Sequence, residues 1–103
     1  MGHREKLLAE LLRRTKKLEA KRPQLLIDAA HRRQMKHGPD YSHSGWWGPT
    51  NETQRKAIRR AMVQLIREGA IVTHCRGQRR VTNIKLTDTG RALAKQIKET
   101  NGT

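Results

Sequence analysis

The sequence contains no phenylalanine, one tyrosine and two tryptophans, so that aromatic residues make up only 3% of its 103 residues. Apolar residues of all kinds reach 34%. A chain of this length and composition has material for one modest, largely aliphatic core and not for two. We therefore expect a single domain over residues 1–103.

Cysteine is scarcer still, with a single residue. The single Cys75 excludes an internal disulfide and is typical of a reducing compartment. It falls in a predicted strand, where we expect a small packed residue. No apolar run reaches the ~18 residues of a membrane-spanning helix, and charged residues from Arg4 onward replace a signal-peptide core. The sequence predicts a cytoplasmic, nucleoid-associated protein with no membrane partner.

Motifs for catalysis and for metal binding are missing as well. The nine acidic residues form no paired-carboxylate cluster, and there is no nucleophile motif and no glycine-rich phosphate loop. We expect no enzymatic activity and no cofactor. Four histidines and the cysteine raise a metal hypothesis, but their spacing matches no known zinc pattern, so no metal site is expected. These residues are His31, His37, His43, His74 and Cys75.

What the chain has in excess is positive charge. Lysine and arginine number 23 against nine acids, giving a formal net charge of +14 and a pI near 11.3. The cations divide almost evenly, with eleven in residues 1–36 and twelve in residues 55–98. Such a surface suits a polyanion, because neutralising phosphates supplies salt-dependent affinity. Charge alone does not separate DNA from RNA.

The strongest helical pattern lies in residues 51–69, where Gly69 ends the helix. Apolar residues recur every three or four positions and predict one buried stripe: Ile58, Met62, Leu65 and Ile66. At about 100° per residue, the cations fall mainly on the opposite side. They are Lys56, Arg59, Arg60 and Arg67. A solvated surface would look similar, but a cationic excess of this size favours contact with nucleic acid.

A basic hairpin is predicted over residues 70–86, followed by a helix over residues 87–99. Two β-branched runs flank a loop that contains Gly77, and no acid occurs between Gly69 and Thr87. Thr87 stands at the N-cap of the last helix, with Asp88 in its first turn. The hairpin cations are Arg76, Arg79, Arg80 and Lys85. They would bind DNA or protect an exposed strand edge from aggregation.

Two helices are predicted within residues 1–37, and a loop rich in glycine, proline and aromatic residues follows over residues 38–50. The first helix spans about Arg4 to Ala20, and the second runs from near Pro23 to about Lys36. The loop carries Tyr41, Trp46 and Trp47. In a domain without phenylalanine we expect at least one tryptophan ring to pack in the core. Stacking on a nucleic-acid base stays open as the role of the other ring.

The C-terminal half resembles the winged helix-turn-helix superfamily, and in particular MarR-like and PadR-like regulators. The matching residues are Ile58, Met62, Leu65, Gly69 and Ile71, then Arg80 and Leu86-Thr-Asp-Thr-Gly90. The resemblance implies a mainly α fold with a small β-hairpin wing (α+β), in which residues 51–69 form the recognition helix and residues 70–86 the wing. It also implies a homodimer joined through terminal helices, with four leucines shared between subunits. These leucines are Leu7, Leu11, Leu12 and Leu18.

These observations predict a sequence-preferring double-stranded DNA-binding protein that regulates transcription, with its recognition helix in the major groove. The residues best placed for base edges are Thr53, Lys56, Arg59 and Arg60. Those expected on phosphates, in the adjacent minor groove or elsewhere on the DNA are Thr50, Asn51, Arg67, Arg76, Arg79, Arg80 and Lys85. Two alternatives stay open: a low-specificity DNA-binding protein of a virus, plasmid or nucleoid, used in replication or packaging, and an RNA-associated or ribosome-associated winged helix.

Overall fold

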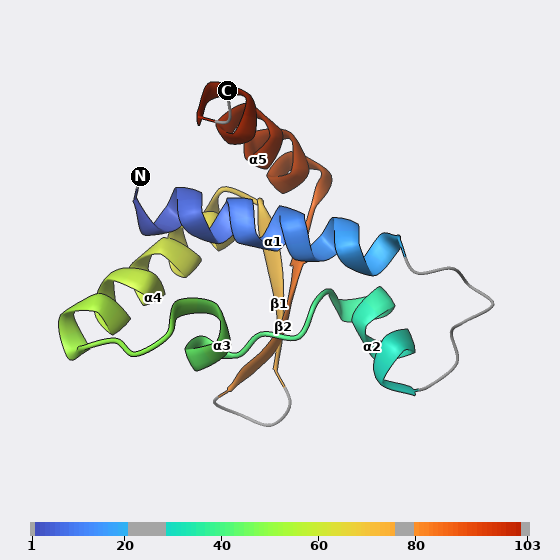
Figure 1. The fold of residues 1–103 in the computed structure, drawn as a ribbon, viewed down its shortest axis with the longest axis horizontal. Helices are drawn as coiled ribbons and strands as arrows, with labels where there is room; N and C mark the ends of the chain where they lie inside the picture. Colours follow the sequence, from blue (N-terminus) through green and yellow to red (C-terminus); the bar gives the residue numbers. More distant parts are fainter. Residues whose placement is uncertain (1, 21–28, 76–79, 102–103) are drawn as a thin grey trace.

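The computed structural model describes residues 2–20, 29–75 and 80–101. Within them lie five helices and one two-stranded antiparallel hairpin, so the predicted mainly helical α+β architecture is confirmed (Figure 1). In chain order the elements are α1 (His3–Glu19), α2 (Ala29–His37), α3 (His43–Trp47), α4 (Glu52–Arg67), β1 (Ile71–Cys75), β2 (Val81–Leu86) and α5 (Asp88–Asn101). The segment expected as a loop over residues 38–50 therefore contains the short helix α3.

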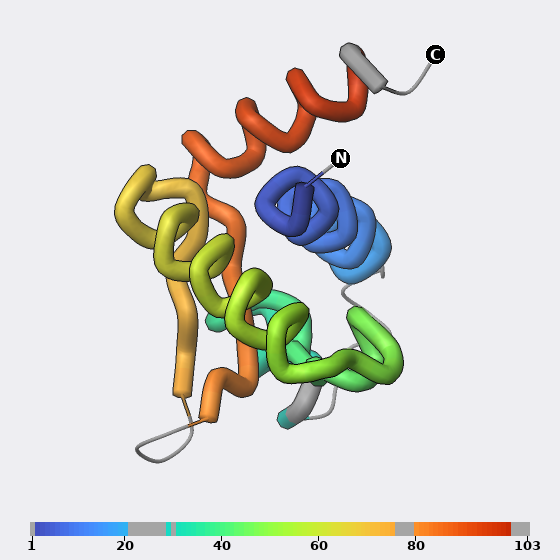
Figure 2. The backbone as a smooth tube through the Cα atoms, turned by 90° about the vertical axis from the view of Figure 1, so that its left-hand side faces the viewer, coloured from blue at the N-terminus to red at the C-terminus, as the bar shows by residue number. Residues whose placement is uncertain are grey.

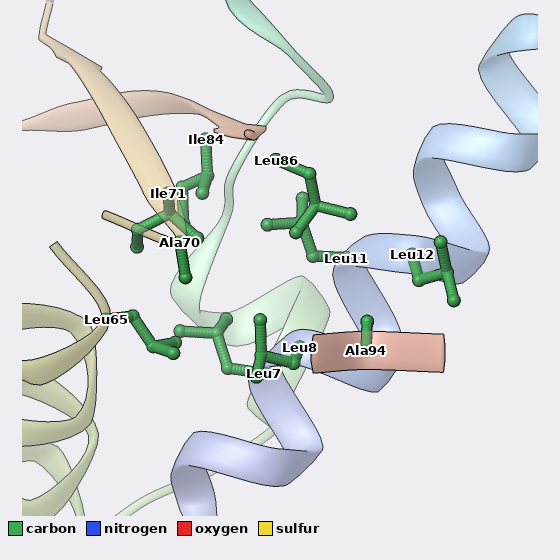
Figure 3. Packing of buried hydrophobic residues seen from close by; sticks show 10 residues of the cluster. All are labelled: Leu7, Leu8, Leu11, Leu12, Leu65, Ala70, Ile71, Ile84, Leu86 and Ala94. Carbon is green, nitrogen blue, oxygen red and sulfur yellow. The ribbon is translucent and has the colours of Figure 1, made fainter. Parts of the chain in front are cut away.

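Helix α1 occupies the centre of the molecule. It packs against α4, α5 and β2, and Figures 1 and 2 show it passing between α5 and α4. Its leucines recur at helical spacing and form one side of the core, which Figure 3 shows meeting side chains from α4, the hairpin and α5. The core residues are Leu7, Leu8, Leu11, Leu12, Leu65, Ala70, Ile71, Ile84, Leu86 and Ala94.

The leucines expected to join two subunits are instead used inside one chain. Leu7, Leu11, Leu12 and Leu18 are all buried in the structure of the single chain. A side chain already removed from water by its own fold gains nothing further from a partner. This corrects the expectation that these four leucines are shared in a homodimer.

The end of α4 is fixed by two backbone hydrogen bonds. The Gly69 N–H donates to the Ile66 carbonyl (3.0 Å) and the Ala70 N–H donates to the Leu65 carbonyl (2.9 Å). Gly69 itself has φ of +72°, in the left-handed region that favours glycine. These contacts form a Schellman motif, which stops the helix and turns the chain directly into β1.

The start of α5 is locked onto that same turn. Thr87 caps α5 as predicted, since its Oγ1 accepts a hydrogen bond from the Gly90 N–H (3.0 Å), and it also donates to the Gly69 carbonyl (2.5 Å). A Cβ at Gly90 would overlap the carbonyl oxygen of Ala70, so the close approach requires glycine. The Leu-Thr-x-x-Gly pattern thus holds the end of α4, the hairpin and α5 together.

A short extended segment adds to the edge of the hairpin. Asp40 forms an isolated antiparallel bridge with Asn83 of β2. The Tyr41 N–H donates to the Thr82 carbonyl (2.8 Å), and the Ile84 N–H donates to the Pro39 carbonyl (3.2 Å). The connection between α2 and α3 therefore behaves as a third, minimal strand beside β2.

Asn83 and Gly38 fix this extra strand in place. Asn83 is fully buried, and its Nδ2 donates to the Gly38 carbonyl and to Asp40 Oδ1, both at 2.9 Å. Gly38 has φ of +95°, and a Cβ there would overlap the Ile84 backbone. Buried amide groups need partners, so these contacts hold the α2–α3 connection tightly against the hairpin.

Candidate nucleic-acid interface

Helix α4 begins at a capping box that uses two polar side chains. Asn51 Oδ1 accepts from the Gln54 N–H (2.8 Å), while Gln54 Oε1 accepts from the Asn51 N–H (3.0 Å). Thr50 Oγ1 lies 2.8 Å from His43 Nε2. The side-chain oxygens of Thr50 and Asn51, which we expected on phosphates, thus have partners within the protein. The Asn-x-x-Gln spacing is the sequence signal for this box.

Replacing Asn51 with alanine tests the capping role. Because the substitution leaves backbone donors at the start of α4 unsatisfied, we expect it to lower the free energy of unfolding by about 0.5–2 kcal/mol, measured by urea denaturation. Thr53→Ala, at an exposed position in the first turn, is the matched control and should change stability by less than about 0.5 kcal/mol. Equal effects from both substitutions would exclude the capping role.

The buried stripe of α4 differs from the predicted one at one position. Ile58, Ala61 and Leu65 are buried and Met62 is half-buried, whereas Ile66 is 46% exposed. The prediction that Ile66 is buried is therefore wrong. The small Ala61 takes a core position instead, and this turns the face that carries Ile66 away from the core.

The exposed face of α4 carries four arginines without carboxylate partners. Arg55, Arg59, Arg60 and Arg67 are all exposed, and none forms an ion pair within the part of the chain that the structure describes. Arg55 was not among the predicted site residues, although it stands in the exposed first turn. Thr53 is exposed as well. Lys56 differs, since its Nζ lies 3.6 Å from Glu52 Oε1.

The arginines of α1 and α5 are instead held by carboxylates. Arg4 donates to both carboxylate oxygens of Glu68, at 2.6 and 2.8 Å, and this interaction lowers the pKa of Glu68. The other such contacts join Arg13 and Arg14 to Glu10, and Arg91 to Glu19. Outside α4 and the hairpin, Arg32 is the sole described arginine without an ion pair.

A groove of about 410 Å³ lies between α4 and the hairpin. Arg59 lines it from α4 and Arg80 from the position just before β2, so two cations line one groove. Figure 2 shows α4 running beside the hairpin on this side of the molecule. The remaining lining residues are Tyr41, Ser42, His43, Ile58, Met62, Val63, Ile66, Thr73 and Val81.

Among the other predicted hairpin cations, Lys85 does not line this groove. Lys85 pairs with Val72 across the hairpin and alternates with Ile84, so its side chain leaves the opposite face of the sheet. There its Nζ donates to the Lys36 carbonyl at 3.3 Å. Arg76 and Arg79 lie outside the described residues.

Both tryptophans are half-buried and pack against the core. Trp46 Nε1 donates to the Asp40 carbonyl (3.2 Å), and the Arg14 guanidinium lies 4.6 Å from the centre of its ring. Trp47 Nε1 donates to the Tyr41 hydroxyl (3.1 Å). Burial raises the pKa of Tyr41, so this hydroxyl stays protonated at neutral pH. Protein contacts thus hold both rings.

The histidines considered for metal binding do not converge. His37 and His74 stack with ring centres 3.6 Å apart, whereas His43 contacts Thr50. In the described ranges no three His, Cys, Asp or Glu side chains form a group suited to a metal ion. Cys75 is exposed, which corrects the expectation that it is packed.

From the stacked histidines we expect stability to depend on pH. Removal from water lowers the pKa of His37, and nearby positive charge lowers it further; the charges are those of His74, Lys36, Lys85 and Arg33. The unfolded chain, with a histidine pKa near ~6.5, therefore binds a proton more readily than the folded one. The stabilisation is present above about pH 6.5 and is lost as the pH falls through the lower, folded-state pKa.

We expect the melting temperature to fall between about pH 7.5 and pH 5, the range in which a histidine with a lowered pKa takes up its proton. His37→Gln should flatten this part of the profile, because it removes the titrating group. A His37→Gln profile parallel to that of the unmodified protein would contradict the assignment.

Comparisons with protein-family models, curated proteins and solved structures find no match to this chain. None of the described helices is both long and apolar enough to cross a membrane.

Proposed function

We propose that this protein is a winged-helix protein that binds double-stranded DNA, with α4 as the recognition helix and the β1–β2 hairpin as the wing. Three features of the fold support this. Helix α4 is followed directly by the hairpin and then by α5, as the resemblance implies. Residues 39–41 add a minimal third strand to the hairpin, and the Thr87–Gly90 contacts hold the end of α4 against the hairpin.

The observation that carries the proposal is the unpaired arginine face of α4 beside Arg80. Within the described ranges these five arginines have no carboxylate partner, whereas most of the other described arginines do, so the five can meet an external anion. Helix α4 has 16 residues and is about 24 Å long. Its diameter with side chains matches a B-DNA major groove, which is about 12 Å wide.

In the proposed complex, different residues contact different parts of the DNA. Arg59 and Arg60, with Thr53 and Lys56 nearer the start of α4, are placed for base edges, where arginine to guanine is the commonest specific pairing. Arg55 and Arg67 are placed for phosphates. With α4 in the major groove, Arg80 lies beside it and is placed for a phosphate of the strand that borders that groove.

Duplex DNA is favoured over single strands and RNA. Proteins that bind single strands stack bases on free aromatic rings, whereas the rings of Trp46 and Trp47 already have protein partners. The major groove of A-form RNA is too narrow for side chains to read. As a small DNA-binding domain with a preferred site, the protein would regulate transcription by occupying that site.

Competition binding at two salt concentrations tests the proposal. A labelled duplex is challenged with unlabelled duplexes of several sequences, with single-stranded DNA and with structured RNA. We expect duplex DNA to compete best, with affinity falling steeply between 50 and 200 mM salt as counterions are released. Equal competition by all duplex sequences would favour the low-specificity alternative, and stronger competition by RNA would reject the proposal.

A further inference from the structure

Two apolar side chains interrupt the cationic face of α4. Val63 is 41% exposed and Ile66 is 46% exposed, and both line the groove between α4 and the hairpin. Residues three apart on a helix are neighbours on its surface. Val63 also lies four residues from both Arg59 and Arg67, so the apolar pair sits among the arginines proposed to meet DNA.

We propose that Val63 and Ile66 contact the methyl groups of thymine in the major groove, which would give this protein a preference for thymine beside the bases read by arginine. This rests on the proposed duplex binding. The thymine 5-methyl is the apolar group that a standard base pair displays in the major groove. An exposed apolar pair flanked by guanidinium groups is complementary to a thymine methyl group that is surrounded by polar base edges and phosphates.

The charge around the pair favours DNA over the other occupants of an apolar surface. A second copy of this chain would bring its own arginines against Arg59, Arg60 and Arg67, and like charges brought together in an interface repel. Two side chains also provide far less area than a stable protein interface buries. A polyanion that carries methyl groups satisfies both the charge and the apolar contact.

The experiment compares two 24-base-pair duplexes of one sequence, the first containing all four bases and the second with deoxyuridine in place of every thymine. The exchange removes the methyl groups and keeps the base pairing. We expect the unmodified protein to bind the uracil duplex about fourfold more weakly for each methyl group that the apolar pair covers. In Val63→Ala/Ile66→Ala, the ratio of the two affinities should approach one, while the salt dependence of binding is kept.

Val72→Ala is the matched control, because Val72 is 56% exposed but lies on the opposite face of the hairpin. This variant should keep the full preference for thymine. Equal binding of both duplexes by the unmodified protein would overturn the thymine contact and leave duplex binding intact. Failure to bind either duplex would reject the proposed function itself. A change in sedimenting mass in Val63→Ala/Ile66→Ala would show that a second copy occupies the pair, and would also overturn the inference.

Discussion

Replacing Arg59 and Arg60 together with glutamine is expected to weaken duplex binding by about 30-fold to 1,000-fold, or roughly 2–4 kcal/mol. Both guanidinium groups are exposed on α4 and lack carboxylate partners in the described residues, so DNA contact does not first require breaking an ion pair. Because both side chains are placed on base edges, the loss should be larger for a preferred site than for other sequences, and the plot of log affinity against log salt should keep most of its slope. Fluorescence anisotropy with a labelled duplex measures both quantities.

The matched control removes the same charge from α1 and α5. Arg13→Gln/Arg91→Gln also lowers the net charge by two, but these arginines contact Glu10 and Glu19. We expect the control to weaken binding at least tenfold less than the α4 variant, because paired charges are already neutralised locally. Equal losses would mean that DNA responds to net charge alone and that α4 has no special role.

The largest loss of stability is expected from Leu11→Ala. Leu11 is fully buried in the cluster of α1 leucines that meets the hairpin, α4 and α5 (Figure 3). Truncating a buried leucine removes its burial free energy and leaves a cavity, which together cost about 2–5 kcal/mol. This is a large share of the 5–15 kcal/mol typical of a folded domain. Urea denaturation followed by circular dichroism measures the change.

Val72→Ala again provides the comparison, since its side chain is mostly exposed and its truncation should alter stability by less than about 0.5 kcal/mol. A loss for Leu11→Ala as small as that for Val72→Ala would mean that α1 is not the centre of the core. Retention of cooperative unfolding in both variants makes the two free energies comparable.

Much of the fold follows from local patterns in the sequence. The leucine spacing of α1, the periodicity of α4 and the Thr87 cap each depend on residues within a few positions of one another, and the structure contains all three. The contacts of Asn83 with Gly38 and Asp40 span more than 40 residues. No local pattern identifies such a pair, so the third strand segment was not predicted.

The candidate site was predictable to a similar degree. Helical periodicity alone placed Arg59, Arg60 and Arg67 on the exposed face of α4. It could not show which arginines have partners, because ion pairs such as Arg4 with Glu68 join residues 64 positions apart. Ile66 was misplaced because periodicity gives the direction of a buried face only approximately, and packing by the small Ala61 decides which flank is covered.

Mapping backbone amide shifts by NMR while a duplex is added tests the proposed binding surface most directly. The proposal predicts that the largest shifts fall on Arg55, Arg59, Arg60, Arg67 and Arg80 and on residues lining the groove between α4 and the hairpin. The outer faces of α1 and α5 should change little. Shifts concentrated on α1 or α5, or no shifts at a duplex concentration that saturates binding in other assays, would contradict it.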